Sequence, residues 1–188
     1  MQRFSDLQIT DKLIKSVSLA PGLYEYSAFT RCDFSGMDLR GFSFTECDFN
    51  DCDLSNANIH GVQFREVVFD GCKMLGLDFE HCGAYGLDFK VSDCLLNYCN
   101  FTGCNLKKKK FNRCHLIQAD FTHADLTDVI FDSCDLSQTV FFKTLLEGAN
   151  MVSSFHYSFD LSQNRVKGMK VSMEGSLAFT RVFGVEVV

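Results

Sequence analysis

The sequence contains no tryptophan, a single proline and no long apolar run. A membrane-spanning helix needs about 18 consecutive apolar residues, so we expect a chain that does not cross a membrane. The first residues, Met1–Asp6, lack the basic region followed by an apolar region that marks a secretory signal. Glycine-rich phosphate loops and Cys-x-x-Cys pairs are also absent, which argues against nucleotide binding and zinc binding.

What the sequence has instead is a five-residue period. From Leu96 to Leu146 every fifth residue is a leucine or a phenylalanine, and the two types alternate without exception. A helix repeats every 3.6 residues and a strand every two, so neither explains the pattern. A fixed repeat of this kind indicates a solenoid built by stacking one small unit.

The same central positions continue backwards from Phe89 to Phe4, with a step of seven residues between Phe89 and Leu96. We therefore place two extra residues within Lys90–Leu95. Because Ala84 also stands where a large central residue is the rule, we expect one irregular coil over residues 82–95.

Other positions of the repeating unit are equally regular. All ten cysteines lie two residues before a central residue, where the remaining units carry mostly Ala, Val or Thr. A unit with one large and one small inward residue can form one side of a narrow tube whose centre is filled by the large side chains. We interpret the cysteines as small buried spacers, and ten unpaired thiols favour a reducing cytoplasm.

The residue just before the central one is usually Asp or Asn. The resulting pattern, A-(D/N)-L-x-x, resembles that of the pentapeptide-repeat family over about residues 27–151. The resemblance implies an all-β, right-handed quadrilateral β-helix with four units per coil, in which residues 20 apart stack. We expect a cap or worn first coil over 1–26, the β-helix over 27–151, and a C-terminal cap over 152–188.

The C-terminal segment changes character. Residues 172–184 read as a short helix that Ser172 caps and Gly184 ends. Its apolar residues occupy more than one side of the helix. This apolar surface is larger than the end of a β-helix can cover, so we expect a homodimer through this helix. The candidate interface residues are Leu177, Phe179, Val182 and Phe183.

No catalytic site is indicated. The five histidines fall at outward positions without metal-ligand spacing, and no nucleophile motif is present. We therefore expect no enzyme activity, no bound metal and no cofactor. Lys109 would occupy an inward position within Lys107–Lys110, so we expect a distorted corner or an outward-reaching side chain. That lysine run could contact phosphate, although such runs are more often solvated corners.

Charge divides the chain into two halves. Residues 1–95 carry 15 acidic and 8 basic side chains, whereas residues 96–188 carry 9 and 10. The acidic half disfavours direct contact with nucleic acid and suits a basic protein surface. Its carboxylates either support turns as part of the repeat or imitate the regular charges of DNA. The candidates are Asp33, Asp38, Asp48, Asp53, Asp78 and Asp88.

One subgroup of the family resembles the chain beyond the repeat: the quinolone-resistance proteins of the Qnr and MfpA type, and the microcin B17 immunity proteins. The closing stretch, 172–188, resembles the immunity-protein terminus. The resemblance implies binding to DNA gyrase or topoisomerase IV in place of DNA, which protects the enzyme from a quinolone or a peptide toxin. Long Qnr-type loops are missing here, which favours the loop-less type. The alternative is a generic scaffold with an unknown partner.

Overall fold

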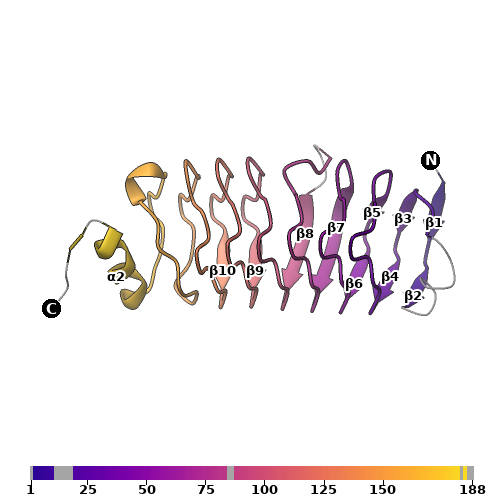
Figure 1. Cartoon of the computed structure of the whole chain (residues 1–188), viewed down its shortest axis with the longest axis horizontal. Helices are drawn as coiled ribbons and strands as arrows, with labels where there is room; N and C mark the ends of the chain where they lie inside the picture. The colour runs from indigo at the N-terminus through magenta and orange to yellow at the C-terminus, as the bar shows by residue number, and fades with distance from the viewer. Residues whose placement is uncertain (1, 11–18, 84–86, 183, 186–188) are drawn as a thin grey trace. The chain divides into compact units, whose positions relative to one another are not determined.

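The computed structural model describes residues 2–10, 19–83, 87–182 and 184–185. The chain divides into two compact units, Met1–Leu95 and Leu96–Val188, and we describe each by itself. The prediction of a right-handed quadrilateral β-helix followed by a short C-terminal helix is confirmed (Figure 1). Among the described residues, no helix is long and apolar enough to cross a membrane.

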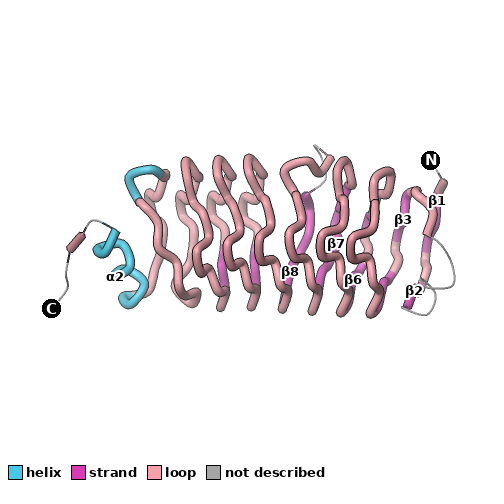
Figure 2. The backbone as a smooth tube through the Cα atoms, viewed as in Figure 1, coloured by secondary structure: helices cyan, strands magenta, loops and turns pink. Residues whose placement is uncertain are grey.

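In the first unit the chain winds into four-sided coils of 20 residues. Parallel strands occupy two adjacent sides, and turns joined by single bridges such as Asp33↔Asp53 form the other two (Figure 2). The strands are β1 (Arg3–Ser5), β2 (Gln8–Thr10), β3 (Leu23–Glu25), β4 (Ala28–Thr30), β5 (Ser43–Thr45), β6 (Asp48–Asn50), β7 (Gln63–Asp70) and β8 (Leu87–Ser92).

We number the sides in chain order by the large inward residues that they contribute. Side 1 carries Tyr24, Phe44 and Phe64; side 2 carries Phe29, Phe49 and Phe69; side 3 carries Phe34, Leu54 and Met74; side 4 carries Leu39, Ile59 and Phe79. The first coil already follows this register, because Phe4 pairs with Tyr24 and Ile9 with Phe29.

Stacked aromatic rings fill the interior of the first unit. Along side 2 the ring of Phe49 lies 4.7 Å from that of Phe29 and 5.1 Å from that of Phe69, in near-parallel stacks. The side 1 ring of Phe64 meets Phe69 edge-on at 5.5 Å. Stacked and edge-on pairs are the favoured arrangements of aromatic rings, so one residue type packs well both along and across the coils.

The prediction about the two extra residues is wrong in position. In β8, Phe89 pairs with Val67 and Val91 pairs with Phe69. This offset is 22 residues instead of the regular 20, so both extra residues precede Phe89. The backbone N–H of Gly83 still donates to Val62 in the regular offset, so the extra residues lie between Gly83 and Phe89; Ala84 lies outside the described residues. Val91, not Phe89, therefore continues the side 2 column. Both side chains are buried, because alternate residues of a strand face the same way.

The second unit repeats the same architecture. Strands β9 (Lys110–Asn112) and β10 (Ile130–Asp132) pair in parallel with a 20-residue offset. The ring of Phe121 stacks on Phe101 at 4.9 Å and on Phe141 at 5.5 Å, as the period predicts. The coil register also extends beyond Met151, since Leu145 bridges Arg165 and Asn150 bridges Lys170 after the 3-10 helix η1 (Leu161–Gln163).

Helix α2 (Met173–Val182) follows the last coil. The hydroxyl of Ser172 accepts a hydrogen bond of 2.9 Å from the N–H of Gly175, and Gly184 adopts a φ of 69° after the helix, so both predicted end signals are confirmed. The helix packs closely on the coil: a Cβ at Gly175 would lie 1.7 Å from the Tyr157 hydroxyl oxygen. Only glycine allows this approach without displacement of the helix.

The cysteines are thiols that face the interior, and all but Cys82 are buried. Four of them stack along side 3 of the first unit, namely Cys32, Cys52, Cys72 and Cys94. The pKa of the Cys52 thiol is raised to about 12. The hydrogen bond with Cys32 lowers this pKa, but the hydrogen bond with Cys72 and burial together raise it by more. The thiolate is the reactive form, so this column is protected chemically as well as sterically.

We expect thiol labelling of the native protein at neutral pH to modify Cys82 first, because the other nine cysteines are buried. Mass spectrometry after brief labelling should show one fast adduct, and a Cys82→Ser variant should lose it. Equally fast modification of Cys52 in the native protein would contradict the buried column.

Replacing a ring in the middle of a column should destabilise the fold strongly. Phe69 is fully buried, and Phe69→Ala should lower the free energy of unfolding by about 3–5 kcal/mol, through lost burial and the cavity left behind. Denaturant unfolding measures the change. Phe142→Ala is the matched control because that ring is 40% exposed; equal effects of the two substitutions would mean that the column does not carry the stability.

Candidate functional site

The six carboxylates predicted from the sequence do not share one surface. Asp48 and Asp88 lie on side 2 of the first unit, in β6 and β8. Asp33 and Asp53 bridge each other on side 3. Asp38 and Asp78 belong to side 4, where Asp38 bridges Asn58. The structure therefore brings two of the six candidates to the strand-bearing side and distributes the other four over the turn-bearing sides.

Those four carboxylates support turns. In each case one carboxylate oxygen accepts a hydrogen bond from the backbone N–H two residues later, for example from Ser55 to Asp53 at 2.9 Å and from Glu80 to Asp78 at 3.2 Å. The bonds to Asp33 and Asp38 measure 3.0 and 3.1 Å. This is the standard Asp turn. These side chains have a structural role that accounts for the frequent Asp and Asn in the repeat.

Side 2 and its two corners carry a different set of acidic residues, which we call the acidic face. All of them are exposed. They are Asp6, Glu46, Asp48, Asp51, Glu66, Asp70, Asp88 and Asp93. The basic residues on the same surface are Arg31 and Lys90. Most of this set escaped the sequence analysis, which considered only the position before each central residue; a 20-residue comparison of outward positions would have aligned Glu46 with Glu66.

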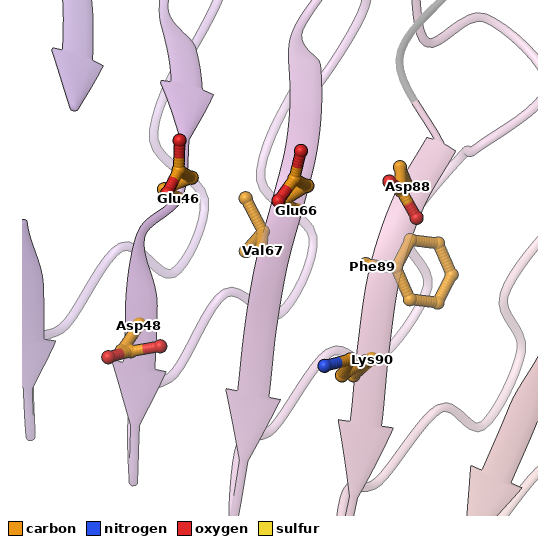
Figure 3. Close-up of a pocket in the computed structure, with 7 residues that line it drawn as sticks. All are labelled: Glu46, Asp48, Glu66, Val67, Asp88, Phe89 and Lys90. Atoms are coloured by element: carbon orange, nitrogen blue, oxygen red, sulfur yellow. The ribbon is translucent and has the colours of Figure 1, made fainter. Parts of the chain in front are cut away.

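The corner between sides 1 and 2 stacks like charges. Thr45 pairs with Arg65, which places Glu46 beside Glu66, and the next coil adds Asp88 in the same row (Figure 3). Neighbouring layers are about 4.8 Å apart, and two unit charges at about 4 Å repel by about 1 kcal/mol even in water. Glu46 and Glu66 have φ of 50° and 53°, and stability alone would favour uncharged Asn at such positions, so the charges need another explanation.

These corner carboxylates border a hollow in the surface. Its volume is about 400 Å³, and it is lined by Glu46, Asp48, Glu66, Val67, Asp88, Phe89 and Lys90. One coil earlier, exposed Tyr26 occupies the same corner, and the Glu46 carboxylate raises the pKa of its phenol by charge and by hydrogen bonding. Carboxylates, an aromatic ring and a hollow together suit a cationic side chain of a partner.

In the second unit the carboxylates are balanced by cations from neighbouring coils. Lys107 pairs with Asp125 at 3.2 Å, Lys110 with Asp132 at 2.8 Å, and Arg165 with Glu147 at 2.6 Å. Each of these three ion pairs joins residues 18–22 apart in sequence, as the stacked coils require. The lysine run is therefore partly neutralised within the protein, which weakens the case for a phosphate-binding site.

Lys109 occupies its predicted inward position without breaking the coil. Its N–H donates to Leu106 at 3.2 Å, and its carbonyl accepts from Ile130 at 2.9 Å. The backbone is thus regular, so of the two expected outcomes the distorted corner is not observed. The residue is half-buried, which fits a long side chain that keeps its ammonium in water.

The histidines are exposed, as predicted, and two of them lie in one group with acidic residues. On side 4, His81 Nδ1 lies 2.7 Å from Asp78 Oδ2, and its ring stacks on His60 at 5.5 Å. Asp78, Glu80 and His81 bring three potential metal-ligand atoms within 4.8 Å of one another. Sequence spacing did not reveal this group, because its members converge only when the turn closes.

The residues predicted for a dimer interface face different directions. Phe179 is 7% exposed and packs inside its own chain, against Tyr157 and Phe159 with ring centroids 5.9 and 5.1 Å away. Leu177 and Val182 are 40% and 41% exposed. Phe183 lies outside the described residues. The surface that α2 offers to a second chain therefore comprises Leu177, Val182 and the exposed Met173.

Comparisons with known proteins agree with this architecture. A family model described as a pentapeptide repeat region matches residues 42–121, and one for eight copies of the pentapeptide repeat matches residues 119–154. Together they cover more than half of the chain. The chain belongs to the pentapeptide-repeat family. A search of curated proteins found no match.

Solved structures of QnrB1, described as a plasmid-mediated fluoroquinolone resistance protein, are similar to this pentapeptide-repeat protein. Two trypsin-treated variants superpose with TM-scores of 0.65 at 19% and 20% identity; the alignments cover 99% and 100% of this chain and 97% and 100% of the variants. Full-length QnrB1 gives a TM-score of 0.50 at 18% identity, over 98% of this chain and all of that one. The superpositions establish a shared fold, and at identities this low they establish the fold alone.

Proposed function

We propose that the acidic face binds a basic, DNA-binding surface of DNA gyrase or topoisomerase IV in place of DNA. Bound in this way, the protein protects the enzyme from a quinolone or from a peptide toxin. The observation that carries the proposal is the row of stacked carboxylates at Glu46, Glu66 and Asp88. The fold shared with QnrB1, itself described as a fluoroquinolone resistance protein, supports it.

The charge arrangement is suited to imitate a nucleic acid. Duplex DNA presents one negative charge per about 1.7 Å of its axis. Coils stacked about 4.8 Å apart approach this density when each contributes two or three outward carboxylates, as the coil from Glu46 to Asp51 does. The charges sit on rigid, hydrogen-bonded strands, so little conformational entropy is lost when a partner binds.

Protection of an enzyme requires no chemistry from this chain. We propose a binding protein rather than an enzyme, acting in the cytoplasm, where its ten thiols remain reduced. The partner is a protein surface rather than nucleic acid, because the acidic face would repel phosphates.

We further propose that two chains associate through α2, which would join two acidic faces in one assembly. Exposed Met173 and Leu177 are four residues apart and share one side of the helix. Apolar side chains on a single helix face are typical of a helix–helix contact.

A generic scaffold is the second candidate function. It is favoured by the turn-supporting Asp residues, such as Asp38 and Asp53, which show that much of the acidity belongs to the repeat itself. A scaffold would bind partners of another kind and would leave topoisomerases unaffected.

The first test is gyrase supercoiling and drug-induced DNA cleavage, with the purified protein added. We expect inhibition of supercoiling or rescue from cleavage by wild type. The double variant Glu46→Lys/Glu66→Lys should need at least about tenfold more protein for the same effect, because close charge pairs across interfaces contribute about 1.5 kcal/mol or more.

The control reverses the charge of one carboxylate on another side. Glu80→Lys alters an exposed side chain on side 4 and should leave the effect on gyrase unchanged. If it weakens protection as much as the double variant, net charge rather than the acidic face is responsible. If wild type affects neither gyrase nor topoisomerase IV, the scaffold is the better description.

The second test concerns the assembly. Leu177→Asp places a charge on the exposed side of α2 and should convert a dimer into a monomer, because an unpaired charge in an apolar contact is costly. Light scattering measures the mass. Glu174→Ala, on the same helix, should leave the mass unchanged. A wild-type monomer, or a Leu177→Asp dimer, would remove this helix from the interface.

A further inference from the structure

We propose that Asp78, Glu80 and His81, together with His60 from the preceding coil, bind a divalent transition-metal ion such as Zn²⁺. The site lies on side 4 of the first unit, away from the strands that carry the acidic face. It is independent of the proposed action on topoisomerases.

Three of the four donors already converge. The potential ligand atoms of Asp78, Glu80 and His81 lie within 4.8 Å of one another, and this is the one such group among residues that the structure describes. Asp78 Oδ2 and His81 Nδ1 are 2.7 Å apart. Two ligands of a tetrahedral Zn²⁺ at about 2.1 Å are about 3.4 Å apart. To admit the ion, these two donor atoms therefore need to move apart by less than about 1 Å.

The backbone turn holds these donors in place. Asp78 Oδ1 accepts a hydrogen bond of 3.2 Å from the N–H of Glu80, so one carboxylate oxygen is fixed and the other remains directed at His81. Asp78 is half-buried, and Phe79 beside it is buried in the core. Donors that are positioned before the metal arrives lose little entropy on binding.

His60 supplies the fourth donor from the neighbouring coil. Its ring lies 5.5 Å from that of His81 with an interplanar angle of 15°. In the 20-residue register His60 stacks on Glu80, about 4.8 Å away at the backbone, so a rotation of its exposed ring would bring a nitrogen to the same centre. Nearby Arg40 does not oppose the ion strongly, because Asp38 pairs with it at 2.6 Å.

The donor types select the class of metal. Two imidazoles and two carboxylates suit Zn²⁺ and similar transition ions, whereas Mg²⁺ and Ca²⁺ prefer oxygen ligands alone. Three positions filled from one coil and one from the neighbouring coil would join the two coils through the ion, beside the backbone hydrogen bond of 2.8 Å that the Gly61 N–H donates to the His81 carbonyl.

The second unit offers a matched control. There Asp135 lies 3.1 Å from His156 Nδ1 and 4.0 Å from His115 Nδ1, on neighbouring coils. Asp and two His meet here as well, without a Glu, but these three side chains do not form a convergent group. His156→Ala thus removes an exposed, acid-paired histidine of equal character without touching the proposed site.

The experiment is calorimetric titration of the untagged, chelator-treated full chain with ZnCl₂. We expect one ion per chain for wild type and for His156→Ala, at least tenfold weaker binding for His81→Ala, weaker binding for His60→Ala, and no heat with MgCl₂. Melting in chelator should show that the variants are folded. Titration with Co²⁺ gives an independent readout, because tetrahedral coordination produces strong visible absorption that His81→Ala should lose.

Several outcomes would overturn the proposal. They are the absence of zinc binding by wild type, equal affinity of wild type and His81→Ala, and an equal loss in His156→Ala. If His60→Ala binds as tightly as wild type, the ion is held by three protein ligands and the role of His60 is wrong. Gyrase assays with His81→Ala separate this site from the acidic face, since protection should persist.

Discussion

The 20-residue stacking of side chains is the constraint on which the whole structure depends. Every side chain on a regular side has a neighbour of the same orientation about 4.8 Å away in the next coil. Inside, this spacing rewards identical flat rings, as in Phe101, Phe121 and Phe141. Outside, the same spacing makes identical charges repel, as at Glu46 and Glu66. The same spacing thus stabilises the interior and places like charges close together on the surface.

The five-residue period predicted a solenoid with stacked rings, the resemblance to the pentapeptide-repeat family supplied its four-sided form, and the end signals Ser172 and Gly184 predicted the limits of α2. The period could not locate the extra residues before β8. Phe89 and Val91 are both apolar and both face inward, so either fits a central position by composition. The acidic face and the His60–His81 pair required knowledge of which outward positions share a side. Phe179 faces the interior because Tyr157 lies beside α2, and a helical pattern in the sequence does not reveal that neighbour.

The two units use the same backbone with opposite electrostatic designs. In the second unit several carboxylates meet a cation one coil away, as Asp132 meets Lys110, and acidic and basic residues are nearly equal in number. In the first unit acidic side chains follow one another along side 2 with Arg31 and Lys90 as counter-charges. A repeat fold allows this division because outward residues do not influence the interior, so the surface charge of each coil can change separately.

The buried thiol column makes folding and the folded state respond differently to oxidants. Once the coils have formed, Cys32, Cys52, Cys72 and Cys94 are enclosed, and the pKa of the Cys52 and Cys72 thiols is raised to about 12. The unfolded chain instead exposes ten thiols that can join in many combinations, and a crosslink between cysteines of different sides would prevent the coils from closing. We therefore expect oxidants to interfere mainly with folding during synthesis, because nine of the ten thiols are shielded once the coils have closed.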